Sequence, residues 1–164
     1  MKTVKSSFKF HGGVHPEYHK DLARDKAIES IGIPSTLVIS MSQHLGAPAK
    51  CLVKPGDRVV KGQRIGEKGG FISANVHSSV CGVVKSVDLK QGAAGGYANA
   101  VTIETEDSDE TAFMSPLDWK SASKEELLKR VEDAGICGMG GAGFPTYVKL
   151  SPKEPEKIEY VIAN

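Results

Sequence analysis

A run of glycines near the end of the chain has the residue types best suited to binding a ligand. Residues 138–146 read Gly-Met-Gly-Gly-Ala-Gly-Phe-Pro-Thr, so four glycines fall within six residues. Glycine has no side chain and adopts positive φ angles easily, which lets backbone N–H groups approach a flat or phosphorylated ligand closely. Pro145 has the φ of a first helical residue, and the positive end of a helix beginning there would face the glycines and favour an anion.

The same glycines have two other interpretations. The spacing Gly138-x-Gly140-x-x-Gly143 formally matches a dinucleotide-binding fingerprint, but that fingerprint must follow a strand, and residues 123–134 predict a helix. A glycine-rich connector between two closely packed elements is the plain structural alternative. Lys149 would lie one turn into the next helix, with its ammonium near whatever the loop binds; a surface lysine is its alternative.

Three histidines near the start of the chain could in principle hold a metal ion. His11, His15 and His19 are four residues apart, a spacing that converges on one point only along a continuous helix. Two glycines and a proline within this run oppose such a helix. We therefore expect a structured loop and assign no metal ligands.

The cysteines point to a reducing compartment. Cys51, Cys81 and Cys137 are far apart and form no Cys-x-x-Cys pair. Scattered cysteines in a chain whose first ten residues do not form a signal peptide are typical of reduced thiols in the cytosol. The spacing also contains no ligand run for an iron–sulfur cluster.

Composition excludes several function classes. The chain has 164 residues, 40% of them apolar and 25% charged, with a formal net charge of +1. This balance is that of a soluble globular protein and gives no basic footprint for nucleic acid. No apolar run approaches the roughly 20 residues that a membrane-spanning helix requires.

Short strands and turns dominate the middle of the chain. Residues 37–39 and 97–105 predict strands, and in the second of these Val101 and Ile103 should point the same way. Between them lie two blocks rich in valine and glycine, residues 51–68 and 78–89, and we expect the second block to break at Gly82.

The last third of the chain has a different character. Residues 107–120 are rich in acids and predict a linker, and residues 123–134 predict a helix with a capping box formed by Ser123 and Glu126. Gly135 should end this helix. Residues 158–163 predict a buried strand, and residues 17–30, at the other end of the chain, are a candidate short helix.

The two central blocks resemble the halves of a biotinyl/lipoyl-like domain, also called a barrel-sandwich hybrid. The matching residues are Val53-x-Pro55-Gly56-Asp57-x-Val59-x-x-Gly62-Gln63 and His77-Ser78-x-Val80-x-Gly82-x-Val84. In carrier members of that family, a lysine in a tight turn between the halves takes the cofactor. Here residues 69–75 contain no Met-Lys-Met and Lys68 precedes the glycine pair, so we expect the scaffold without an attached group.

Together, three features resemble the N-terminal part of the RnfC subunit of the Rnf ion-translocating ferredoxin:NAD⁺ oxidoreductase. They are the Gly-Gly-Val-His-Pro start, the lipoyl-like module and the glycine loop that follows Ala-Gly-Ile-Cys. The string Gly-Gly-Ala-Gly-Phe-Pro-Thr is also similar to the flavin- and NADH-binding subunit of respiratory complex I. Met139 departs from that pattern, because the complex I subunit has arginine there.

The resemblance implies an α+β fold: a β-rich barrel-sandwich hybrid module followed by the start of an α/β flavin/NADH-binding domain. The implied division is residues 1–106 for the N-terminal segment and module, 107–120 for the acidic linker, and 121–164 for the incomplete start of the second domain. Implied contacts to FMN or NAD(H) are the backbones of four glycines and the side chain of one lysine: Gly138, Gly140, Gly141, Gly143 and Lys149.

The resemblance also implies a function. The full-length parent would pass electrons between ferredoxin-linked iron–sulfur clusters, FMN and NAD(H), as a peripheral subunit on the cytoplasmic side of an ion-pumping membrane complex. Its partners would be the other subunits of that complex, with ferredoxin an indirect one. Two 4Fe-4S clusters would lie in a later part of the parent. We expect the 164 residues alone to be inactive and to hold no cofactor tightly, with no side chain acting as acid or base. The alternative is a non-catalytic lipoyl-like scaffold that docks partner subunits and binds no nucleotide.

Overall fold

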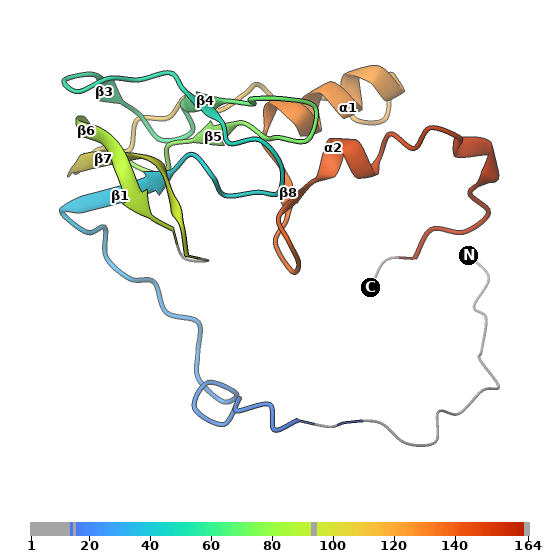
Figure 1. Ribbon diagram of the computed structural model, residues 1–164, viewed down its shortest axis with the longest axis horizontal. Helices are drawn as coiled ribbons and strands as arrows, with labels where there is room; N and C mark the ends of the chain where they lie inside the picture. Colours follow the sequence, from blue (N-terminus) through green and yellow to red (C-terminus); the bar gives the residue numbers. More distant parts are fainter. Residues whose placement is uncertain (1–13, 15, 93–94, 163–164) are drawn as a thin grey trace. The chain divides into compact units, whose positions relative to one another are not determined.

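The computed structural model describes residues 14, 16–92 and 95–162 of the chain (Figure 1). The chain divides into two units, residues 1–32 and residues 33–164. Every helix and strand of the described residues belongs to the second unit.

The described part of the first unit contains one turn. The N–H groups of Ala23 and Arg24 donate to the carbonyl of Lys20, at 3.0 and 2.8 Å. The short helix expected over residues 17–30 is therefore wrong. Its apolar side chains are exposed, as at Ile28, so the described residues give this segment no buried face to stabilise a helix.

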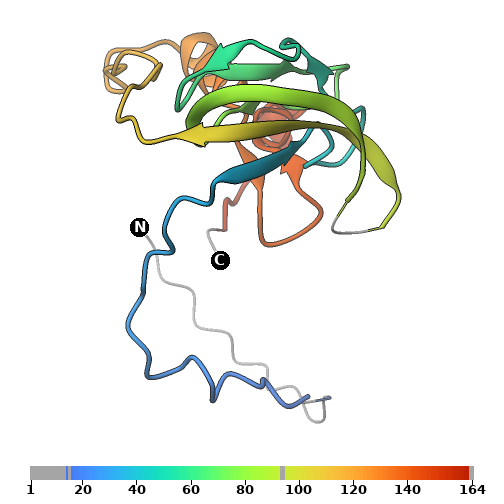
Figure 2. The same cartoon turned by 90° about the vertical axis from the view of Figure 1, so that its left-hand side faces the viewer.

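A four-stranded antiparallel sheet forms one layer of the second unit, in the order β1-β7-β6-β3. Figure 2 shows that the two long central strands are strongly curved. This curled, strand-rich arrangement agrees with the predicted fold class. The strands are β1 (Thr36–Ser40), β3 (Arg58–Val59), β6 (Cys81–Gln91) and β7 (Tyr97–Glu106).

A smaller antiparallel sheet, in the order β2-β4-β5, forms the opposing layer. Its strands are β2 (Lys50–Cys51), β4 (Arg64–Glu67) and β5 (Val76–His77). Side chains of both sheets meet in one core, in which Ile65 of β4 and Val101 and Ile103 of β7 are completely buried. The expectation that Val101 and Ile103 share a direction is thus confirmed, as the two-residue period of a strand requires. We call this two-layered body the barrel.

The expected break at Gly82 is wrong, because β6 continues through it and pairs with β7 on one side and β3 on the other. A Cβ at Gly82 would collide with the carbonyl oxygen of Glu104 on β7. The glycine is needed for the close approach of two strands, which is a common reason for glycine inside a sheet.

The acidic segment at residues 107–120 contains no helix or named strand, and its first part runs along the barrel. Arg58 of β3 donates to the carboxylates of Glu106 and Glu110, at 2.9 and 2.8 Å. The N–H of Ala112 donates to the carbonyl of Lys61 at 2.8 Å. The contacts of Glu110 and Ala112 hold the segment beside the edge strand β3 and the residues that follow it.

A compact helix–hairpin–helix segment follows. It consists of α1 (Lys124–Asp133), the two-stranded hairpin of β8 (Cys137–Gly138) and β9 (Phe144–Pro145), and α2 (Thr146–Lys149). A 3₁₀ turn, η1 (Pro155–Lys157), comes later. We refer to residues 124–149 as the hairpin segment.

The buried strand expected over residues 158–163 is not found in its described part. Residues 158–162 have no regular structure, and Tyr160, Val161 and Ile162 are 78–91% exposed. A strand needs a neighbour to accept and donate its backbone hydrogen bonds, and within the described residues none pairs with this stretch.

Candidate functional site

The helix that leads into the glycine loop begins and ends as predicted. At its start, the hydroxyl of Ser123 accepts from the N–H of Glu126 at 3.2 Å, and the Glu126 carboxylate accepts from the N–H of Ser123 at 2.8 Å. This reciprocal pair is the capping box. At its end, Gly135 takes a φ of +66° just after the C-cap Ala134, which turns the chain toward β8.

The glycines form the tip of the β8–β9 hairpin. Gly138 pairs with Phe144, and residues 139–143 make the turn between them. At both Gly140 and Gly141, an added Cβ would meet no atom within 4 Å. The backbone of the tip is therefore open on this side, as a loop that receives a flat ligand must be.

One end of the turn rests on the barrel. Gly143 has a φ of +66°, and a Cβ there would lie 3.0 Å from the carbonyl oxygen of Gln43 and 3.1 Å from the Cα of His44. The N–H of Leu45 donates to the Gly143 carbonyl at 3.2 Å. Gly143 thus has a structural requirement for glycine, which Gly140 and Gly141 lack.

The helix after the glycines is shorter than the anion-binding interpretation requires. Pro145, with a φ of −58°, caps α2, and α2 contains only four residues. Because a helix dipole sums over successive peptide units, a single turn contributes little of it. An anion at the hairpin would depend mainly on the loop amides and on nearby cationic side chains.

Lys149 is such a cation. A Cβ at Gly138 would lie 2.6 Å from the Lys149 Nζ, so the ammonium lies beside the base of the hairpin. The Lys149 ammonium also affects Cys137. Partial burial raises the pKa of the Cys137 thiol, and the ammonium opposes that rise. Since burial is the larger effect, the pKa of the Cys137 thiol lies above its ordinary value, which disfavours the reactive thiolate.

A groove of about 680 Å³ separates the hairpin tip from the barrel. Backbone and small side chains make up much of its wall, and Met139, 95% exposed, stands at the tip. Its lining residues on the hairpin are Cys137, Met139, Gly141, Ala142 and Gly143, and those on the barrel include Ser42, Gln43, His44 and Tyr97. The tip therefore presents glycine backbone and an exposed methionine to empty space, an arrangement that can receive a flat ligand.

Comparison with known proteins finds a match in each of these two parts of the chain. The family model of the RnfC barrel sandwich hybrid domain matches residues 8–108, which is more than half of the chain. The chain belongs to the RnfC family. The resemblance predicted from sequence and the barrel-sandwich fold are thereby confirmed. The model of the Nuo51 FMN-binding domain matches residues 131–164, a range that includes the whole glycine hairpin.

Relatives of this family come from several bacteria. The chain is 40% identical to the RnfC-type subunit of the proton-translocating ferredoxin:NAD(+) oxidoreductase complex of Clostridium ljungdahlii, with 94% of this chain and 34% of the relative covered. It is 38% identical to the Na(+)-translocating counterpart of Acetobacterium woodii, with 94% and 35% covered. The corresponding subunit of the ion-translocating oxidoreductase complex of Rhodobacter capsulatus is 37% identical, with 96% and 31% covered. The chain thus spans about a third of the length of these relatives.

Lys68 is the lysine nearest residues 69–75, which take the place of the carrier turn. Its side chain contacts the hairpin segment. It forms an ion pair with Glu132 of α1, and its Nζ lies 5.0 Å from the centre of the Tyr147 ring. The Glu132 hydrogen bond raises the pKa of Lys68, against the effect of burial. A carrier lysine must swing freely with its cofactor, so this geometry agrees with a scaffold role. Sequence reasoning missed the pairing because its partners are far apart in the chain.

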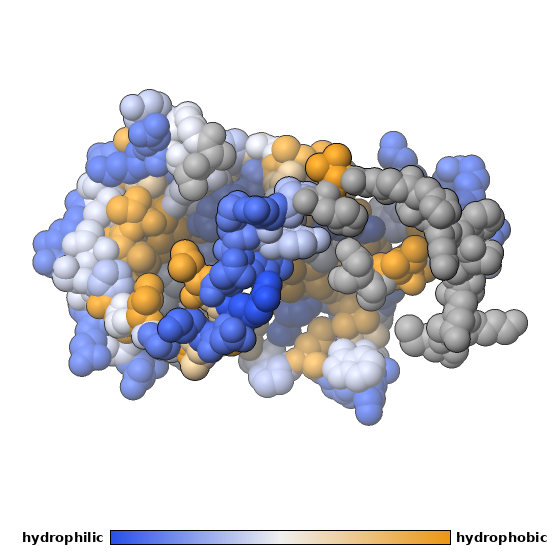
Figure 3. Space-filling view, turned by 90° about the horizontal axis from the view of Figure 1, so that it is seen from below, coloured by the Kyte–Doolittle hydropathy of each residue, from blue (hydrophilic) through white to orange (hydrophobic). Residues whose placement is uncertain are grey.

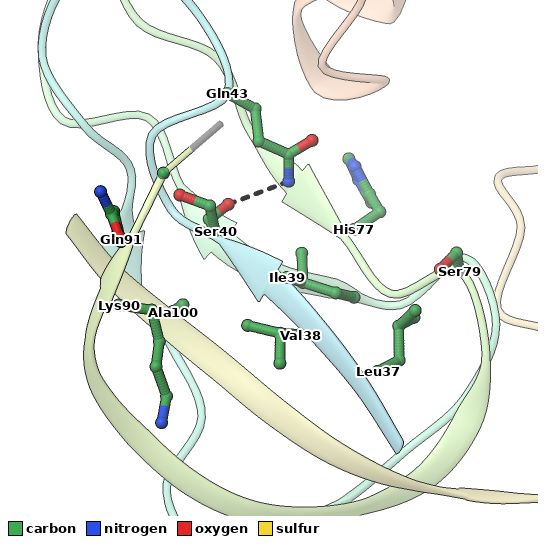
Figure 4. Close-up of a pocket in the computed structure, with 11 residues that line it drawn as sticks. Leu37, Val38, Ile39, Ser40, Gln43, His77, Ser79, Lys90, Gln91 and Ala100 are labelled. Carbon is green, nitrogen blue, oxygen red and sulfur yellow. Dashed lines mark hydrogen bonds between the residues drawn. The ribbon is translucent and has the colours of Figure 1, made fainter. Parts of the chain in front are cut away.

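A second groove, of about 540 Å³, lies beside β1 (Figure 4). It shares Ser40 and Gln43 with the groove at the glycine hairpin, and the Gln43 amide donates to the Ser40 carbonyl at 2.9 Å. On its other side lies His77, whose pKa is lowered by burial and by the Arg64 cation and raised in part by Asp133. No motif in the sequence marked this groove.

The remaining expectations concern metals and membranes. His11 and His15 lie outside the described residues, and His19 is exposed with a φ of +48°. Within residues 14, 16–92 and 95–162, no cluster of three or more potential ligands could hold a metal ion. None of the helices in that part of the chain combines the length and apolarity needed to cross a membrane.

Proposed function

We propose that this chain is the N-terminal portion of a peripheral electron-transfer subunit, with the glycine hairpin forming one wall of its FMN and NAD(H) site. The observation that carries the proposal is the open tip at Gly140 and Gly141, within a region that matches an FMN-binding domain. Its relatives are named as subunits of ion-translocating oxidoreductase complexes, which supports a part in such a complex.

The proposed organisation has three parts. Residues 1–106 carry the barrel, residues 107–120 form the acidic linker, and residues 121–164 begin the flavin domain. The match of the FMN-binding family to residues 131–164 supports the last of these. The two 4Fe-4S clusters would be held by the part of the subunit that the relatives possess beyond this match, since this chain covers about a third of their length.

In this site the residues of the chain bind and orient. The backbone N–H groups at Gly138, Gly140, Gly141 and Gly143 would donate to the nucleotide, and glycine allows the flat ring to approach them. Lys149, whose ammonium lies beside Gly138, would balance the charge of a phosphate. Bound FMN would supply the hydride chemistry with the nicotinamide, so no side chain of this chain needs to act as acid or base.

The proposed place of the subunit is the cytoplasmic side of the membrane, bound to other subunits of an Rnf-type complex. Electrons would move between ferredoxin-linked clusters, FMN and NAD(H), and ferredoxin would contact the complex without binding this chain directly. The complexes named for the relatives, which couple ferredoxin:NAD(+) oxidoreduction to ion translocation, support this assignment.

The alternative, a scaffold that docks partner subunits without binding nucleotide, would use the exposed apolar residues of the barrel. Val38, Leu52 and Phe71 are 49–73% exposed. Figure 3 shows apolar residues exposed on the face that it displays. Because the match to an FMN-binding domain includes the glycine hairpin, we rank the scaffold function second.

A substitution at the open tip tests the first proposal. Gly141→Val adds a side chain where no protein atom lies within 4 Å and φ is not positive, so the variant should fold normally. In the intact subunit it should weaken FMN binding by at least roughly tenfold, which corresponds to about 1.4 kcal/mol. FMN fluorescence titration measures the affinity, and thermal unfolding checks the fold.

Gly32→Val is the matched control, because Gly32 also has open space and lies outside the hairpin. Wild-type FMN affinity in the Gly141→Val subunit would contradict the assignment of the glycine wall. A wild-type subunit that binds no FMN but assembles with other subunits would favour the scaffold function instead.

A further inference from the structure

The turn at residues 68–75, which replaces the carrier turn of lipoyl-like domains, is internally fixed. The hydroxyl of Ser73 is completely buried, accepts from the N–H of Gly69 at 2.8 Å and donates to the carbonyl of Ala47 at 2.7 Å. The Asn75 side-chain oxygen accepts from the N–H of Lys68 at 2.9 Å. Buried polar groups that satisfy one another in this way hold a turn in one conformation.

The end of α1 lies on this turn. The side-chain amide of Asn75, 7% exposed, donates to the carbonyl oxygens of Glu132 and Asp133 at 3.3 and 3.4 Å. These carbonyls belong to the last turn of the helix, where backbone acceptors lack partners within the helix. Gly135 packs so closely on the Asn75 backbone that a Cβ would collide with its carbonyl oxygen.

The two side chains that complete the contact, Glu132 and Tyr147, come from the two helices of the hairpin segment. Lys68 pairs with Glu132 of α1, which is only 17% exposed, and its ammonium also lies 5.0 Å from the ring centre of Tyr147 in α2. The Tyr147 hydroxyl donates to the carbonyl of Phe71 in the turn. Lys68 therefore contacts the helix before the glycine hairpin and the helix after it.

A second contact joins the turn to the glycines themselves. The N–H of Ala74 donates to the Nε2 of His44 at 3.1 Å. The residue after His44, Leu45, donates its N–H to the Gly143 carbonyl. The glycine hairpin is thus held from the helix side by Lys68 and from the barrel side by the segment around His44.

We propose that the turn at residues 68–75 is a dock that fixes the hairpin segment on the barrel, and that Lys68 is a positioning residue for the glycine loop. The position used by carrier domains to present a mobile lysine would here hold a neighbouring segment still. That the loop so positioned receives FMN rests on the proposed function, whereas the docking itself does not.

Hydrogen exchange of backbone amides in the intact subunit tests the dock. Lys68→Met keeps most of the length of the side chain and removes its charge, and should speed exchange across residues 124–149 by about fivefold or more. Exchange in β6 and β7 should stay at the wild-type rate. Glu132→Gln should also speed exchange there, and the double variant should add little to Lys68→Met, because both single changes remove the same ion pair.

Lys85→Met is the control, since Lys85 pairs with Glu104 on the exposed face of the barrel and touches no part of the dock. Unchanged exchange at residues 124–149 in Lys68→Met would overturn the proposal. Faster exchange in β6 and β7 as well would also overturn it, because Lys68 would then stabilise the barrel rather than the contact.

FMN titration of the same variants separates the dock from the proposed function. If Lys68 positions the loop, Lys68→Met should weaken FMN binding several-fold, and Lys85→Met should not. Faster exchange at residues 124–149 with unchanged FMN affinity would overturn the positioning role of Lys68. If the wild-type subunit binds no FMN while the exchange results hold, the proposed function fails and the dock stands.

Discussion

Ile65, Val101 and Ile103 of the barrel are completely buried, whereas α1 and α2, both described in full, contain no buried residue. The barrel closes around apolar side chains from two sheets. The hairpin segment buries Pro145 but is otherwise held on the barrel by polar contacts. These are an ion pair, an asparagine amide and a tyrosine hydroxyl at residues 68–75, and the Leu45 N–H that donates to the Gly143 carbonyl.

The barrel core therefore determines stability, whereas the hairpin segment carries the proposed ligand site. Burial of apolar area is the largest favourable term in folding, so the barrel can be stable without help from the hairpin segment. Segments held by few buried contacts open at lower free energy than the core around them, and ligand-binding loops are commonly of this kind. The comparison predicts that core substitutions act on the whole unit and that substitutions in the hairpin segment act locally.

The largest effect should come from the core. Ile103→Ala removes a completely buried side chain and should lower the free energy of unfolding by about 2–5 kcal/mol. Leu128→Ala, at a partly exposed position of α1, should cost less than about 1 kcal/mol, because little area is lost and alanine favours helix. Urea unfolding followed by circular dichroism measures both values. Equal costs would remove the proposed distinction between the two regions.

Local signals in the sequence predicted the elements well. The alternation of apolar and polar residues predicted β7, and apolar residues on either side of a glycine turn predicted β3 and β4. The serine–glutamate spacing predicted α1 with its cap. Gly82 was misinterpreted because a glycine that ends a strand and one that lets two strands approach look identical in sequence. Only the neighbouring Glu104 carbonyl distinguishes them.

The glycine loop was predicted from the sequence, but neither the β8–β9 hairpin that it closes nor the contacts that hold it were predicted. Lys68 and Glu132 are distant in the chain, and no pattern in either region indicates the pairing. The same holds for the Asn75 amide, which resembles any polar residue in a turn until the end of α1 is placed on it. The strand predicted over residues 158–163 was wrong, in its described part, for a related reason: an apolar run forms a strand only when a neighbouring strand exists to pair with it.

A smaller effect should follow from removing the helix cap. Ser123→Ala deletes the hydroxyl that accepts from the Glu126 N–H and should cost about 1 kcal/mol. The loss should appear as faster amide exchange in the first turn of α1, with the barrel unchanged. Ser121→Ala, whose hydroxyl binds Asp118 in the linker, serves as the control. Faster exchange in β6 or β7 would show that α1 and the barrel form one cooperative unit after all.

The smallest effect concerns the pH dependence of stability through His77, whose pKa depends on groups in both regions. Burial in β5 and the Arg64 cation lower the pKa of His77, and Asp133 of α1 opposes them. Because the folded state then binds this proton less readily than the unfolded state, stability rises with pH across this range. The contribution of neutral His77 to stability is complete at pH values above the ordinary histidine pKa of about 6.5. It is lost as the pH falls through the lowered pKa that His77 has in the folded protein.

His77→Gln should therefore flatten the dependence of the unfolding midpoint on pH between neutral and mildly acidic conditions. Detaching the hairpin segment by Lys68→Met should steepen that dependence, because moving Asp133 away removes the one group that raises the pKa of His77. Urea midpoints of the three proteins across the pH range give both slopes. A Lys68→Met slope equal to that of the wild type would mean that Asp133 stays beside His77 without the ion pair, and that the hairpin segment is attached to the barrel more firmly than its polar contacts indicate.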